Sequence, residues 1–227
     1  MPVDFNTGGS GDFVSCGAAG SSPLANPAAW SCAIRFKLQS SGNGGGPVLW
    51  NKGAFPNTRL IGLWDAGRPS LWQIVMTSYR GATFGTRADA RADVEILPGQ
   101  WTWVAGSYDG TNAPRLFIGT DDRPLFEANY ANQQVGSGAA ADDTGTEARI
   151  GCSGAGGTAF YGFIDEVLWY ASALDIRQAQ AVVSRLVGRP KPDGWWKLDS
   201  YKPKDLSGNG NNGTLNGNPR MIGPFAG

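Results

Sequence analysis

The stretch that decides the fold is Phe160-Tyr-Gly-Phe-Ile-Asp-Glu-Val-Leu-Trp-Tyr170. A more polar segment, rich in alanine and glutamine, follows it. Its β-branched and aromatic residues predict a β-strand. Asp175 and Gln178 then have the spacing of a capping box, in which the aspartate accepts a backbone N–H and the glutamine reaches back. Gly188 is a typical helix stop, so we predict one short helix near 175–187.

Alternation within this strand raises the question of what Asp165 contacts. In an ideal strand Asp165 lies on the same face as Val167 and Trp169, and Ile164 lies on the other. If the face that carries the tryptophan is the core, Asp165 is a carboxylate that points inward. A buried charge is costly unless it is paired, so we expect a partner for Asp165.

The rest of the chain reads as further strands separated by turns. The clearest alternation runs over 30–38, where large apolar residues alternate with small or charged ones. Shorter strands are expected at 12–16, 48–50, 60–64, 71–76, 101–108, 115–118 and 195–198. Small and polar residues over 131–147 predict a long loop, and loops of that length tend to be functional or mobile. The predicted fold class is all-β, a sandwich of two antiparallel sheets with one helix.

Length and composition favour a single domain without a strong electrostatic field. The chain has 227 residues, and Lys+Arg and Asp+Glu number 19 each, so the formal net charge is zero. One all-β domain over 1–227 fits this length. Zero net charge argues against nucleic acid as a partner, and no stretch is apolar enough for membrane insertion.

Cys16, Cys32 and Cys152 are an odd number of cysteines without the short spacing of a metal site. We expect buried, reduced thiols that behave as small apolar residues. A disulfide between Cys16 and Cys32 is the alternative, and it would require an oxidising compartment.

Three motifs carry a family likeness. They are Gly162-Phe-Ile-Asp-Glu-Val167, Trp101-Thr-Trp-Val-Ala-Gly-Ser-Tyr-Asp-Gly110 and Asp205-Leu-Ser-Gly-Asn-Gly-Asn-Asn-Gly-Thr-Leu215. Together they resemble laminin-G-like domains, which share the concanavalin A-like lectin/glucanase jelly roll. The resemblance implies a two-sheet antiparallel β-sandwich of the jelly-roll type, and it implies little about the ligand.

The order of these motifs differs from the order in the family. The resemblance implies that a tryptophan-led strand and the Asn/Gly loop open the domain, whereas here 195–199 and 205–215 close it. We expect a circular permutation in which the C-terminal segment 188–227 completes the sandwich, with its 195–198 strand beside the N-terminal strand. A strand donated to a neighbouring subunit and the remnant of a second repeat are the alternatives.

The Asn/Gly loop is a candidate site for a hard cation such as Ca²⁺. Calcium prefers about six to eight oxygen ligands from a pliable loop, and the resemblance implies that this loop packs near Asp165. The candidate metal ligands are Asp165, Asp205, Asn209 and Asn211, with Ser207 between them. Two alternatives need no metal, because Asn and Gly favour tight turns and Asp165 could accept backbone N–H groups.

Several features argue against an enzyme. The chain has no histidine, which removes the usual general base and every Ser-His-Asp or Cys-His scheme. A glycan hydrolase needs two carboxylates that face each other across the sugar. Asp165 and Glu166 are adjacent and so point to opposite faces of an ideal strand, and the pairs at 121–122 and 142–143 fall in expected loops. We expect no catalytic residues, and the ligand-binding residues stay open.

These features favour a non-catalytic module that serves as a surface, decoration or appendage component of a larger assembly such as a virus particle. A rigid sandwich leaves its loops free to dock on one side and display on the other. Residues 1–9 have no basic or long apolar run, so we expect synthesis in the cytoplasm without a signal peptide and a place on the virion surface. The expected partners are other protein chains of the assembly.

A carbohydrate-binding adhesion module that recognises surface glycans is the alternative function. Nine tryptophans offer faces on which sugar rings can stack. A glycan hydrolase is the second, disfavoured alternative.

Overall fold

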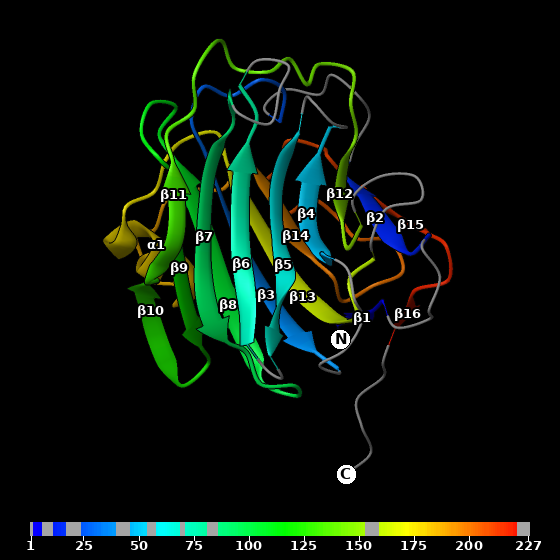
Figure 1. Cartoon of the computed structure of the whole chain (residues 1–227). Coiled ribbons are helices and arrows are strands. Elements are labelled where there is room, and N and C mark those ends of the chain that lie inside the picture. The colour runs from blue at the N-terminus through cyan, green and yellow to red at the C-terminus, as the bar shows by residue number, and fades with distance from the viewer. Residues whose placement is uncertain are drawn as a thin grey trace.

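The computed structural model describes residues 2–5, 11–16, 24–39, 46–53, 58–68, 71–80, 86–152 and 159–221. These residues form two antiparallel sheets of eight strands each, packed face to face, with one short helix outside them (Figure 1). The all-β sandwich predicted from the sequence is confirmed.

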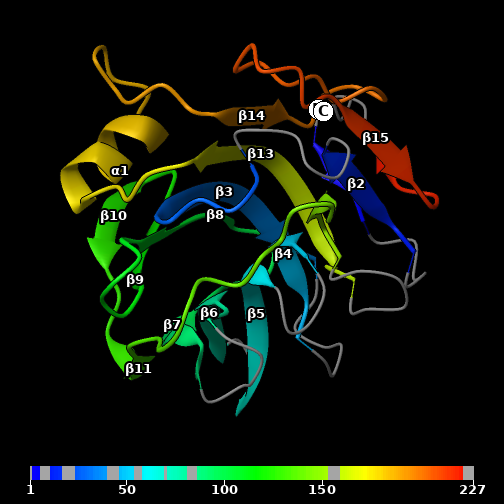
Figure 2. The same ribbon diagram turned by 90° about the horizontal axis from the view of Figure 1, so that it is seen from above.

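The first sheet contains the strand around Asp165 and carries the helix on its outer side (Figure 2). Its order is β10-β9-β8-β3-β13-β1-β16, and β14 pairs with β13 off this path. Its strands are β1 (Val3–Asp4), β3 (Trp30–Leu38), β8 (Trp101–Tyr108), β9 (Arg115–Thr120), β10 (Arg123–Glu127), β13 (Gly162–Tyr170), β14 (Gly194–Lys197) and β16 (Arg220–Met221).

The second sheet has the order β11-β7-β6-β5-β4-β12-β2-β15. Its strands are β2 (Phe13–Cys16), β4 (Val48–Lys52), β5 (Arg59–Arg68), β6 (Leu71–Ser78), β7 (Ala88–Glu95), β11 (Tyr130–Gln134), β12 (Ala148–Ile150) and β15 (Gly213–Asn216). The loop expected over 131–147 is therefore shorter, because its first residues pair with β7 as an edge strand. Alternation did not reveal β11, since the side chains of an edge strand are largely exposed.

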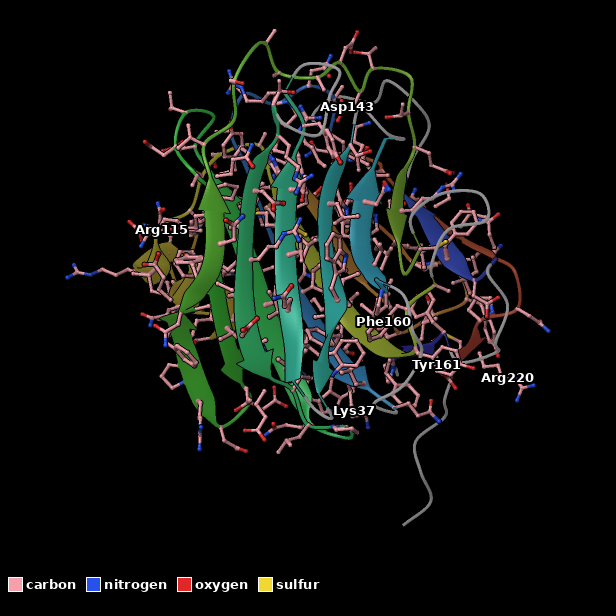
Figure 3. The ribbon with its side chains drawn as sticks, in the orientation of Figure 1. Lys37, Arg115, Asp143, Phe160, Tyr161 and Arg220 are labelled. Atoms are coloured by element: carbon pink, nitrogen blue, oxygen red, sulfur yellow. The ribbon has the colours of Figure 1, made fainter. Side chains whose placement is uncertain are left out.

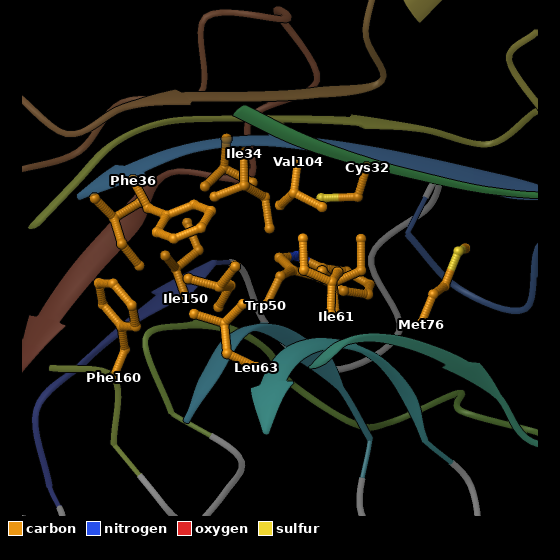
Figure 4. Packing of buried hydrophobic residues seen from close by; sticks show 14 of the residues in the cluster. Cys32, Ile34, Phe36, Trp50, Ile61, Leu63, Met76, Val104, Ile150 and Phe160 are labelled. Carbon is orange, nitrogen blue, oxygen red and sulfur yellow. The ribbon is translucent and has the colours of Figure 1, made fainter. Parts of the chain in front are cut away.

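Large side chains from both sheets meet in one core (Figure 4). The alternation over 30–38 holds, because the even-numbered residues of β3 belong to this core. Trp50 of the second sheet packs between Trp30 and Trp169 of the first, with ring centroids 5.4 and 6.4 Å away. The three cysteines are buried and no disulfide joins them to one another, as expected for reduced thiols that fill apolar space.

The helix α1 (Ile176–Val183) begins as predicted. The carboxylate of Asp175 accepts the backbone N–H of Gln178 at 2.8 Å, and the Gln178 side chain accepts the backbone N–H of Asp175 at 2.9 Å. The capping box is thus confirmed. The eight residues of α1 are too few to cross a membrane, and no other helix in the described part of the chain is long and apolar enough to do so.

The helix ends at Val183, four residues before the position suggested by Gly188. Arg185 adopts a left-handed φ of 55°, which is unusual for a residue with a Cβ. The backbone N–H of Leu186 donates to the carbonyl of Ala181 at 2.9 Å, which closes a Schellman motif. The chain therefore turns away at Arg185, and Gly188 serves a later bend, with a φ of 81°.

The C-terminal strands belong to both sheets of the same chain. β14 pairs with β13, β15 with β2 and β16 with β1. The sequence predicted that the 195–198 strand pairs beside the N-terminal strand, and the pairing partner in this prediction is wrong. Both β14 and β1 pair with β13, along successive parts of the same edge. The long β13 has room for both, since β1 contributes only two residues to that edge.

Candidate functional site

Asp165 occupies a β-bulge in β13. In the pairing with β3, Ile164 faces Phe36 and Glu166 faces Arg35, so Asp165 is an extra residue between them. Both Ile164 and Val167 therefore face the core, although they are three positions apart. The expectation that Asp165 points inward is wrong, because the bulge resets the alternation and directs this side chain to the outer face.

The bulge lies next to a transverse row on the outer face of the first sheet. Register places Gly119, Trp103, Arg35, Glu166 and Lys197 side by side across the five strands from β9 to β14. Gly119 contributes no side chain, and Trp103 is 6% exposed. The row forms a flat floor of one indole and three charged groups.

Arg35 is held in one orientation by two carboxylates from different elements. Its Nη1 donates to Asp165 at 2.8 Å, while Nε and Nη2 donate to Asp121 at 3.1 and 2.5 Å. The guanidinium also lies 4.3 Å from the ring centroid of Trp101, a cation–π distance. Burial opposes ionisation of Arg35, but the hydrogen bonds to Asp121 and Asp165 outweigh burial and raise its pKa.

Glu166, the next residue in β13, is 2% exposed and is also fully engaged. Its carboxylate accepts the indole N–H of Trp195 at 2.7 Å and a guanidinium N–H of Arg185 at 3.0 Å. Arg185 is the residue whose left-handed backbone ends α1. This contact joins the end of the helix to the floor of the site.

Walls around this floor enclose a pocket of about 730 Å³. One wall is the turn between β9 and β10, with Asp121, Asp122 and Arg123, and the other is the C-terminal end of α1. The described residues that line the pocket are Arg35, Trp103, Thr120, Asp121, Asp122, Arg123, Pro124, Asp165, Val183, Ser184, Arg185 and Lys197. Charged side chains of both signs therefore surround a space large enough for a small ligand.

The Asn/Gly loop is stabilised from within by Asp205. One of its carboxylate oxygens accepts the backbone N–H groups of Trp195 at 3.0 Å and Ser207 at 2.9 Å. The other accepts the backbone and side-chain N–H groups of Asn211 at 3.0 and 3.1 Å. Burial raises the pKa of Asp205, but these hydrogen bonds outweigh burial and hold the pKa below its usual value.

The four predicted metal ligands therefore do not converge on one point: Asp165 lies on β13, and the other three belong to the Asn/Gly loop. Asp165 binds Arg35, whereas Asp205 and Asn211 bind each other. The side-chain amide of Asn209 donates to the carbonyl of Asp193 at 2.8 Å. Within the described residues, no group of three or more His, Cys, Asp or Glu side chains could hold a metal ion. Calcium stays a prediction, and these contacts favour the alternative in which the loop is an Asx-type turn.

The loop that follows β11 is anchored at the opposite end of the sandwich from Lys37 (Figure 3). Asp143 is fully buried and forms an ion pair with Arg59. The backbone N–H of Asn26 donates to Asp143 at 2.8 Å, and its side-chain amide donates to Asp142 at 2.5 Å. These contacts give the loop a structural anchor.

A family model described as the concanavalin A-like lectin/glucanases superfamily matches residues 8–179. The chain belongs to the concanavalin A-like lectin/glucanases superfamily. The laminin-G-like resemblance of the sequence is thereby confirmed. The match ends inside α1, so the strands β14, β15 and β16 of this lectin-like chain lie outside it. Among curated proteins, none matches the sequence.

Three solved structures illustrate the shared fold. A heptameric SAP-like pentraxin from Limulus polyphemus has 13% identity and a TM-score of 0.59, over 83% of this chain and 84% of the pentraxin. Tailspike protein 2 of an Escherichia coli O157:H7 bacteriophage has 14% identity and a TM-score of 0.55, over 88% of this chain and 28% of the tailspike. The CBM40 of a Ruminococcus gnavus IT-sialidase, bound to α2,3-sialyllactose, has 15% identity and a TM-score of 0.53, over 80% of this chain and 95% of the CBM40. Identities this low show the fold alone.

Proposed function

We propose that this chain is a non-catalytic carbohydrate-binding module whose ligand occupies the pocket around Arg35. The observation that carries the proposal is the fixed guanidinium of Arg35, held between Asp121 and Asp165 beside Trp103 and Lys197. Sugars present many hydroxyl groups and apolar ring faces. Prepositioned charged groups can bind the hydroxyls without reorganisation.

The same geometry supports a role without catalysis. A glycan hydrolase needs two carboxylates that face each other across the bond to be cleaved. Here the guanidinium of Arg35 lies between Asp121 and Asp165 and contacts both. Glu166 is engaged by Trp195 and Arg185. A glycan at this site would meet hydrogen-bonding groups rather than an acid and a nucleophile.

A glycan array followed by calorimetry on the bound sugars tests the proposal. Lys197→Ala and Asp122→Ala remove pocket side chains that form no side-chain hydrogen bond with another described residue, and we expect each to weaken binding at least tenfold. Lys204→Ala is the matched control, because Lys204 is an exposed cation that does not line the pocket. Binding that survives both pocket changes but is lost in the control would place the ligand elsewhere. An array without any bound glycan would contradict the proposal itself.

A second candidate function is the one that the sequence favoured, a surface component of a larger assembly such as a virus particle. The phage tailspike supports it, because a similar fold forms one part of that protein, 28% of its chain. Such a component should bury on the order of 1,000 Å² or more against neighbouring chains. Electron microscopy of the native particle would test this, and a monomer with small contacts that binds glycans would leave only the first proposal.

A further inference from the structure

A groove with an acidic rim and two exposed apolar side chains lies at the open edge of the sandwich, between β7 and the β9–β10 hairpin. It encloses about 570 Å³. Leu97 and Phe126 line it and are 46% and 54% exposed, which is high for large apolar side chains. We call this the acidic groove, since Asp93, Glu95 and Asp122 also line it and Arg123 is the one cation among its described residues.

A complementary surface projects from the turn after α1, residues 185–191, which we call the basic turn (Figure 2). Leu186 is 56% exposed and Val187 is fully exposed. The flanking side chains Arg185, Arg189 and Lys191 are all cationic, and the segment contains no carboxylate. The guanidinium of Arg185 already binds Glu166, and the guanidinium of Arg189 lies over the ring of Trp195. The basic turn thus presents two apolar side chains flanked by the cations of Arg189 and Lys191.

Backbone geometry places these apolar side chains in solvent. The Schellman motif normally packs the residue after the left-handed position against the last helical turn. Here the corresponding residue is Leu186, and more than half of it is exposed. Gly188, with a φ of 81°, then bends the chain again. Neither Leu186 nor Val187 belongs to the two apolar clusters of the described residues.

We propose that copies of this chain associate head to tail, with the basic turn of one copy bound in the acidic groove of the next. Leu186 and Val187 would cover Leu97 and Phe126, and the cations of Arg189 and Lys191 would face Asp93, Glu95 and Asp122. The two surfaces are complementary. Each carries exposed apolar side chains, and the charges around those side chains have opposite signs on the two surfaces. Since the surfaces differ, the contact is heterologous, and repetition gives a closed ring or an open filament.

Sedimentation velocity of the full chain over a range of concentrations tests the proposal. We expect association that weakens at high salt, because the flanking ion pairs are exposed and screened. Val187→Asp and Phe126→Asp should each abolish association when studied alone, and the exposure of both side chains leaves the core intact. Tyr201→Asp is the control, since Tyr201 is 69% exposed and lies outside both surfaces. It should associate as the unaltered chain does.

Mixing the two altered chains gives the decisive result. A Val187→Asp chain keeps its groove and a Phe126→Asp chain keeps its basic turn, so one intact contact remains between them. An equimolar mixture should form a 1:1 dimer and nothing larger. A monomer at all concentrations in the unaltered chain, or an unchanged assembly in both variants, would overturn the proposal. A mixture that stays monomeric while the unaltered chain assembles would show a different interface and overturn it as well.

Discussion

At the scale of single residues, buried and half-buried carboxylates position backbone and guanidinium groups in this chain. Asp205 orders the Asn/Gly loop through N–H donors, Asp143 anchors the long loop through Arg59, and Asp165 fixes Arg35. In each case the carboxylate has partners that offset the cost of removing a charge from water. These three aspartates thus act as structural anchors.

Substitution of Asp205 should reveal its role. Asp205→Ala leaves buried N–H groups of Trp195, Ser207 and Asn211 without an acceptor, so we expect a loss of roughly 2–4 kcal/mol in the free energy of unfolding. The pKa of Asp205 is lower in the folded than in the unfolded chain, where it is about 4. Its contribution is therefore present above pH 4 and is lost as the pH falls through the folded pKa. Denaturant titrations between about pH 2 and pH 7, a range that spans the pKa of Asp205 in the unfolded chain, measure how the free energy of unfolding changes.

The calcium prediction can be separated from this loop chemistry by a chelator. The alternative without a metal predicts the same melting temperature in EDTA and in millimolar Ca²⁺, because Arg35 engages Asp165 and N–H groups engage both oxygens of Asp205. A cation that binds only the folded state would instead raise stability by about 2.7 kcal/mol at one hundred times its dissociation constant. An increase of that size that Asp205→Ala abolishes would establish the metal site.

At the scale of elements, departures from ideal periodicity build the candidate site. The bulge in β13 brings Asp165 to the same outer face as Glu166, and the early end of α1 brings Arg185 to Glu166. Both depend on partners in other elements, namely β3 for the bulge and β13 for the helix end. Local pattern alone would have made β13 regular and α1 longer.

The strand β14 should be essential for stability through Trp196. Its indole is fully buried in the core and donates to the carbonyl of Asn211 at 2.6 Å. We expect Trp196→Ala to cost roughly 3–5 kcal/mol, since it leaves a large cavity and an unpaired carbonyl. Tyr201→Ala is the matched control and should change the stability by less than about 0.5 kcal/mol, because this aromatic ring is mostly exposed. Equal effects of the two changes in urea titrations would contradict this role of β14.

At the scale of the whole molecule, the two ends of the chain are paired in both sheets. β1 pairs with β16 in the first sheet, and β2 pairs with β15 in the second. Contacts between residues about two hundred positions apart therefore complete the sandwich. Such non-local pairing makes the C-terminal segment part of one cooperative unit with the N-terminal strands.

Truncation after Gly194 tests this cooperativity. The shortened chain retains the whole region matched by the family model but loses Trp196 and Leu198 from the core. We expect the entire sandwich to lose several kcal/mol of stability rather than only a tail, because β13 and β2 each lose a paired strand. Calorimetry of both chains measures the change. An unchanged melting temperature would mean that β14 to β16 are dispensable.

The sequence alone determined the sandwich, the main strands and the start of the helix. Alternation over 30–38 and the capping box at Asp175 are local patterns, and local patterns report secondary structure directly. Only tertiary structure decided where Asp165 points and which groups share the pocket. The bulge follows from the register against β3, and the row from Trp103 to Lys197 joins strands far apart in the chain. Pairing register depends on the packing of every strand together, so no single stretch of sequence encodes it.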